Sequence, residues 1–128
     1  SPFNWAAIKA RELGLADNGV IVGAHGPDGK RAKFSNSGAN ISCPGVDVLS
    51  SVSFDESGQP STHSYGKMSG TSMASPYCAS GHILLSLVRP GYTGKELVAC
   101  MEASAEKTDD GVPMLRLAEA VTSCPERP

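Results

Sequence analysis

The sequence predicts an α/β fold whose sheet is mostly parallel and is incomplete within these residues. Short runs of consecutive apolar, β-branched residues, which are typical of strands covered on both faces, alternate with helical patterns. Only two or three such runs occur in 128 residues, and so few strands make a poor parallel sheet. We therefore expect residues 1–128 to form part of one domain, with residues 125–128 as a tail.

The first half of the chain predicts one helix followed by short strands. A shared apolar face and a proline suited to a first turn predict a helix over Pro2–Leu15. The β-branched run VIVGA predicts a buried strand over Val20–Ala24, and the turn GPDG follows it. A short strand and a polar turn are expected within residues 30–38, then a strand, a Pro-Gly turn and a second strand over Val46–Val52. The polar segment Ser53–Lys67 predicts an exposed hairpin or loop.

The second half predicts three helices. The strongest helical pattern covers Ser72–Val88 and ends before a Pro-Gly pair. The sequence TGKE is a capping box that opens the next helix, from Gly94 to about Ser104. A last helix is expected over Met114–Ser123.

Charge and hydropathy exclude two classes of partner. The net charge is −2 with acidic and basic residues interspersed, so no basic stripe indicates nucleic acid and no basic face indicates a membrane surface. The longest dense apolar segment, Ile83–Val88, is far shorter than the roughly 20 residues that cross a bilayer. We expect neither nucleic acid nor a membrane as a partner.

The four cysteines do not predict a metal or redox site. Cys43, Cys78, Cys100 and Cys124 lack the CxxC spacing of zinc and thioredoxin-type sites. Cys43 and Cys78 fit small core residues. The four could form two disulfides or stay as buried thiols. For Cys100, on a predicted helix, and Cys124, directly after one, a disulfide and two thiols are equally open.

The segment SGTSMASP places Ser72 where a loop of small residues ends and a helix begins. A serine hydroxyl is a weak nucleophile unless a base takes its proton and donors stabilise the oxyanion, and the free N–H groups of a helix start can be such donors. Pro76 is expected to do no harm, on the view that its missing N–H has no helical partner there. The plainer interpretation is that Ser72 only caps the helix, since serine is a preferred N-cap residue.

The string GTSMASP, from Gly70 to Pro76, resembles residue for residue the nucleophile motif of the subtilisin-like serine proteases. The upstream segment Val20–Ser51 and the downstream segment Gly111–Val121 are similar to the same family. The likeness covers most of the chain. It implies the C-terminal portion of the family's three-layer fold, in which a parallel sheet is covered on both faces.

The resemblance implies a role for each residue of the motif. Ser72 is the expected nucleophile, and its own backbone N–H is one oxyanion donor. Gly70 and Thr71 shape the turn, and Met73 lies beside the nucleophile, where its oxidation would inactivate the enzyme. Secretion is also expected from the family.

The same resemblance bears on the substrate cleft and on ions. Phe34 and Ser69 are expected to border the cleft. We expect no cofactor and no assignable metal site. The family often binds a structural calcium ion, but the acidic stretches Phe54–Gly58 and Asp109–Asp110 have the composition of solvated loops.

The family's triad occurs in the order Asp, His, Ser, so its Asp and His are expected to precede the residues of this chain. The three histidines present are poor substitutes. His82 lies ten residues into the Ser72 helix, about 15 Å along it at 1.5 Å per residue. His63 has no partner acid fixed against it, and His25 matches a strand-to-turn segment elsewhere in the fold.

The predicted function is that of a C-terminal chain or fragment of a serine endopeptidase, which hydrolyses peptide or protein substrates through an acyl-enzyme on Ser72. Its Asp and His would come from the N-terminal part of the same protease, as a separate chain or a missing segment. This chain alone is therefore expected to be inactive. The alternative is a non-catalytic binding or inhibitory module derived from the same fold.

Overall fold

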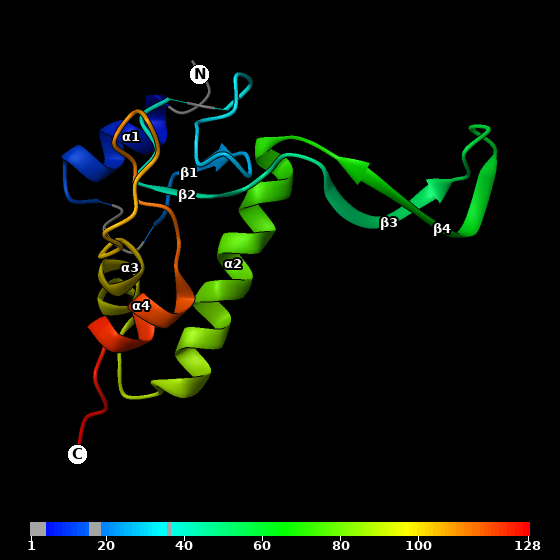
Figure 1. The fold of residues 1–128 in the computed structure, drawn as a ribbon. Helices are drawn as coiled ribbons and strands as arrows, with labels where there is room; N and C mark the ends of the chain where they lie inside the picture. The colour runs from blue at the N-terminus through cyan, green and yellow to red at the C-terminus, as the bar shows by residue number, and fades with distance from the viewer. Residues whose placement is uncertain (1–4, 16–18, 36) are drawn as a thin grey trace.

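The computed structural model describes residues 5–15, 19–35 and 37–128. Within them the elements follow in the order α1 (Trp5–Glu12), β1 (Val22–His25), β2 (Ile41–Pro44), β3 (Val48–Phe54), β4 (Pro60–Met68), α2 (Thr71–Val88), α3 (Gly94–Met101) and α4 (Leu117–Ser123). Figure 1 shows α2 leading away from the small β1–β2 sheet, with α3 and α4 beside it and the β3–β4 hairpin projecting from the body.

The central sheet is parallel, as the sequence predicts. β1 pairs with β2 in a register that places Ala24 opposite Cys43. The other edge of β2 carries one further parallel bridge, from Ser42 to Met114. The Ser42 N–H donates to the Pro113 carbonyl (2.8 Å), and the Leu115 N–H donates to the Ser42 carbonyl (2.9 Å). The segment around Met114 therefore extends the sheet.

This bridge corrects the predicted last helix. Met114 and Leu115 are extended and buried against the sheet, and α4 begins only at Leu117. Pro113 lies next to the bridge, and its carbonyl accepts the hydrogen bond from the Ser42 N–H. Apolar residues do recur at helical spacing from Met114, but the side chains of Met114 and Leu115 pack against the sheet instead of forming the first turn of a helix.

Three other predicted elements differ from the structure. The short strand expected within 30–38 is only a single bridge between His25 and Arg31. The strand expected over Val46–Val52 is β3, which leaves the central sheet and pairs antiparallel with β4. The segment Ser53–Lys67 is thus largely a hairpin, as expected. The first helix covers Trp5–Glu12, and the start predicted for it at Pro2 lies outside the described residues.

Two disulfides cross the core. Cys43–Cys78 joins β2 to α2, and Cys100–Cys124 joins α3 to the residue after α4. The sequence predicts small core residues at Cys43 and Cys78 and leaves their bond open. They are buried, at 0% and 2% exposure, and β2 lies directly against α2 and brings their Cα atoms to 6.0 Å, within the range that a disulfide spans.

Helix α2 is apolar on nearly every side. It packs against β1, β2, α3 and α4, yet large side chains on its remaining faces stay exposed, among them Ile83 (58%) and Leu87 (71%). Of the helices in the described part of the chain, none combines the length and apolar character needed to cross a bilayer.

Candidate active site

Ser72 is the second residue of α2 and is exposed. The N-cap of the helix is Gly70, whose carbonyl accepts hydrogen bonds from the N–H groups of Met73 (3.0 Å) and Ala74 (3.3 Å). The interpretation of Ser72 as a simple N-cap is therefore wrong. Among the described residues its hydroxyl has no hydrogen-bond partner.

The turn before Ser72 is attached to the segment that follows β2. The Gly70 N–H donates to the Gly45 carbonyl (2.8 Å), and the Asp47 N–H donates to Ser69 Oγ (2.8 Å). A Cβ on Gly45 would stand 2.6 Å from Ala24 Cβ and 2.8 Å from the Gly70 carbonyl oxygen. Only glycine lets β1, β2 and the start of α2 come this close.

Pro76 corrects a second expectation about this helix. It is the sixth residue of α2, beyond the positions whose N–H groups lack a helical acceptor. At this position an N–H would donate to the carbonyl of Ser72, four residues earlier. Pro76 has none, so the helix lacks one hydrogen bond at Ser72 itself.

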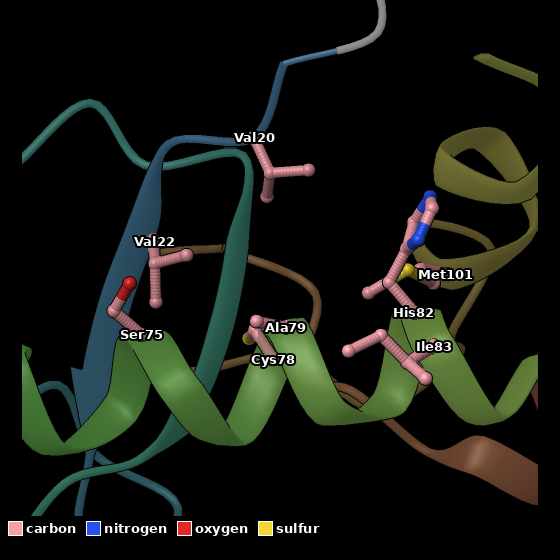
Figure 2. A pocket seen from close by; sticks show the side chains of 8 residues that line it. All are labelled: Val20, Val22, Ser75, Cys78, Ala79, His82, Ile83 and Met101. Atoms are coloured by element: carbon pink, nitrogen blue, oxygen red, sulfur yellow. The ribbon is translucent and has the colours of Figure 1, made fainter. Parts of the chain in front are cut away.

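Both flanks of α2 beyond Ser72 carry a pocket. On the side of β1, a pocket of about 370 Å³ is lined by Val20, Val22, Ser75, Cys78, Ala79, His82, Ile83 and Met101. Figure 2 shows Ser75, Ala79 and His82 on successive turns of α2. A groove of about 470 Å³ on the other flank is lined by Met73, Pro76, Tyr77 and Leu84, among others. Both hollows are lined mainly by apolar side chains and lie along α2.

None of the three histidines is hydrogen-bonded to Ser72. His82 lies far along α2 beside Met101 (Figure 2), and His63 is exposed on β4 in the hairpin. His25 is buried at the end of β1, where Nδ1 lies 2.8 Å from Ser42 Oγ. Burial, followed by the positive charge of Arg116, lowers the pKa of His25, and Asp28 opposes this shift.

The other predicted site residues occupy varied places. Thr71 and Met73 are half-buried on the first turn of α2. The Ser69 hydroxyl accepts a hydrogen bond from the Asp47 N–H, as described above. Phe34 is half-exposed in the loop between β1 and β2. The cleft roles expected of Phe34 and Ser69 stay predictions.

The aspartates of both acidic stretches accept hydrogen bonds from the protein itself, Asp55 from its own turn and Asp109 from Arg31. Asp55 accepts hydrogen bonds from the Ser57 hydroxyl (2.6 Å) and from the backbone N–H groups of Gln59 and Ser57, and these bonds, that of the hydroxyl first, lower the pKa of Asp55. Asp109 accepts from the Arg31 N–H (2.8 Å). In the described ranges no three His, Cys, Asp or Glu side chains gather as metal ligands.

Two features that hold this site were missed from the sequence. Gly45 follows Pro44, and the pair was taken only as a turn, although a Pro-Gly pair directly after a buried strand also permits close approach of another backbone. The Cys43–Cys78 bond has no local signal, because 35 residues separate its ends.

Comparison with known proteins identifies the family. The profile of the subtilase family matches residues 8–118. The chain is 42% identical over 83 residues to an extracellular basic protease of Dichelobacter nodosus, which covers 63% of this chain and 13% of that protein. It is 34% identical over 93 residues to a thermophilic serine proteinase of Bacillus sp. strain AK1, which covers 71% of this chain and 21% of that protein.

A solved structure shows the same fold. A protease of Pseudoalteromonas arctica PAMC 21717 superposes with a TM-score of 0.69 at 30% identity, over 84% of this chain and 36% of that chain. The chain thus spans between 13% and 36% of the length of these three proteins. The predicted α/β fold with an incomplete parallel sheet is confirmed, and the chain belongs to the subtilase family.

Proposed function

We propose that this chain carries the nucleophile of a serine endopeptidase and that Ser72 attacks the carbonyl carbon of a peptide bond. The observation that carries the proposal is the exposed Ser72 hydroxyl, which has no partner among the described residues, on a helix start fixed to β2 through Gly45. The family match and two relatives named as proteases support it. The substrates are peptides or proteins.

The reaction proceeds through an acyl-enzyme. A histidine base takes the proton of the Ser72 hydroxyl as the Oγ–C bond forms, and the Ser72 N–H donates to the oxyanion. The C–N bond then breaks, and the base returns the proton to the leaving amine. Water, activated by the same base, hydrolyses the ester and frees Ser72.

The base and its orienting Asp belong, on this proposal, to an N-terminal part of the same protein, as a segment or a separate chain. Its docking surface is the uncovered part of α2, where the following side chains are 51–71% exposed: Tyr77, Ile83, Leu84, Leu87 and Val88. A helix that is apolar all round is typical of the interior of a larger domain. This chain alone is then nearly inactive, because loss of the base in subtilisin lowers turnover by roughly 10⁶-fold.

We place the protein outside the cytoplasm. One relative is named as an extracellular protease. Two buried disulfides, Cys43–Cys78 and Cys100–Cys124, also fit an oxidising compartment. Both arguments support secretion independently of the active site.

The test is to label the whole protein with a fluorophosphonate, which phosphonylates activated serines. The wild type should react and cleave peptides, Ser72→Ala should do neither, and Ser75→Ala, one turn further along α2, should keep both. The chain without its N-terminal part should not react. Absence of labelling in the folded whole protein would overturn the proposal and favour a non-catalytic module.

A further inference from the structure

The segment that leads into Ser72 is the β3–β4 hairpin, which gives it little support. β4 ends at Met68 and belongs to a two-stranded hairpin that projects from the body (Figure 1). An isolated two-stranded sheet is only marginally stable. The position of the nucleophile turn must therefore be set by its other attachments, and these lead to residues 45–47 through the Gly70–Gly45 and Ser69–Asp47 hydrogen bonds.

These two hydrogen bonds both precede Ser72 and both end on residues 45–47, so they fix where the helix begins, whereas its direction depends on the packing of α2 against β1, β2, α3 and α4 and on any covalent link. The Gly70–Gly45 bond precedes Ser72 by two residues and can act as a pivot. After Ser72 the helix is weakened, because Pro76 removes the hydrogen bond to the Ser72 carbonyl. The first turn thus needs a second attachment beyond the proline.

The Cys43–Cys78 disulfide stands at that point. Cys78 lies two residues beyond Pro76 and six beyond Ser72, and Cys43 lies two residues before Gly45. The two attachments therefore bracket Ser72 and both end on residues 43–45. Ala74 is fully buried between them, and a Cβ on Gly45 would lie only 3.3 Å from Ala74 Cβ, so the absence of a side chain at Gly45 leaves room for Ala74.

We propose that the Cys43–Cys78 disulfide is a positioning device for the nucleophile, which holds the first two turns of α2 in the direction that aligns Ser72 with its base and substrate. The inference rests on the proposed function of Ser72. Both cysteines are buried, so the bond is a permanent brace that reductants reach only when the core opens. It acts on Ser72 through α2 and touches no substrate.

The experiment uses the whole protein with Cys43→Val/Cys78→Ala, which removes the bond and keeps most of the apolar volume. Two quantities are measured per folded molecule: kcat and KM for a peptide, and the rate of phosphonylation of Ser72 separated into affinity and reaction steps. Misplacement of a reacting group by about 1 Å costs roughly 100-fold. We expect kcat and the phosphonylation step to fall by about 10- to 100-fold, while KM and inhibitor affinity change by less than about threefold, as for a contribution made in the transition state.

The matched control is Cys100→Ala/Cys124→Ala. This pair is also buried and closes a loop of similar length, with a separation of 24 against 35 residues, so the two bonds contribute comparably to stability. Its removal should lower the melting temperature and leave kcat per folded molecule unchanged. Equal loss of kcat in both variants, or none in the first, would overturn the inference.

Two further measurements keep the result interpretable. If the first variant does not fold, Cys43→Ala/Cys78→Val tests the same bond with the larger side chain on α2. Ser72→Ala separates the two proposals. If it stays active, the proposed function fails and the positioning role with it, whereas an inactive Ser72→Ala beside a fully active disulfide variant refutes the positioning role alone.

Discussion

At the scale of single residues, Gly45 is the position where the fold tolerates least change. An added methyl would meet Ala24 Cβ at 2.6 Å and the Gly70 carbonyl oxygen at 2.8 Å, and neither atom belongs to a side chain that can swing away. Gly45→Ala should therefore lower the free energy of unfolding by about 1–3 kcal/mol, as overpacking does, and should displace the start of α2.

Denaturant titration measures the cost, and fluorophosphonate labelling of Ser72 in the whole protein reports the displacement. Gly94→Ala is the control, because a Cβ there meets nothing within 4 Å and the residue begins α3. A Gly45→Ala protein as stable and reactive as the wild type would show that β1, β2 and α2 are not packed as described.

His25 predicts how stability depends on pH. Burial, with help from Arg116, holds its pKa below the usual 6.5, so the unfolded chain binds a proton more readily than the folded one. The contribution of neutral His25 is therefore complete above pH 6.5, and it is lost as the pH falls from there through the folded pKa. We expect the free energy of unfolding to decline over this range.

His25→Asn should flatten that decline, because asparagine can still bond Ser42 near the position of Nδ1 and does not titrate in this range. Urea titrations between pH 7 and pH 5 measure the slope. His63→Asn, on the exposed β4 strand, should leave it as in the wild type. An unchanged slope in His25→Asn would mean that His25 does not set this dependence.

At the scale of elements, local signals were predictable and distant ones were not. The capping box at Thr93 is confirmed, because both of its hydrogen bonds join residues three apart: Glu96 N–H to Thr93 Oγ1 (3.2 Å) and Thr93 N–H to Glu96 Oε1 (3.0 Å). The false start of the last helix at Met114 has the opposite origin. Its cause is Ser42, more than 70 residues away in the sequence.

In the candidate site, too, the local features were predictable from the sequence and the long-range contacts were not. The motif around Ser72, the proposed nucleophile, can be read from the sequence because it is contiguous, and the start of α2 is visible in it. What holds Ser72 in place comes from Gly45 and Cys43, which are distant in sequence and meet α2 only in the folded chain. The strand β4, rich in Ser, Thr and His, carries no period-two apolar pattern that would have predicted its length.

At the scale of the whole molecule, the uncovered sides of α2 predict how it exchanges hydrogen. If the proposed N-terminal part docks on α2, the exposed side chains of Ile83, Leu84, Leu87 and Val88 should be covered and the helix should open less often. Hydrogen exchange of α2 should therefore be slower in the whole protein than in the isolated chain. Mass spectrometry of peptides from residues 71–88 measures the difference, with peptides of the β3–β4 hairpin as the internal reference.

Equal exchange rates for α2 in the two proteins would contradict docking on these faces. In that case the exposed apolar side chains would belong to a surface with another use. The prediction is independent of catalysis, so it holds for an inactive whole protein as well.

The two disulfides also set an order for the maturation of the chain. Their loops follow one another, Cys43 with Cys78 and then Cys100 with Cys124, and they do not interleave. When a chain enters an oxidising compartment from its N-terminus, Cys78 arrives when Cys43 is the only earlier cysteine in this sequence, and Cys124 arrives when only Cys100 is left. Pairing each of these four cysteines with its nearest predecessor among them gives the two bonds of the structure, so on the proposed export these four need no reshuffling with one another.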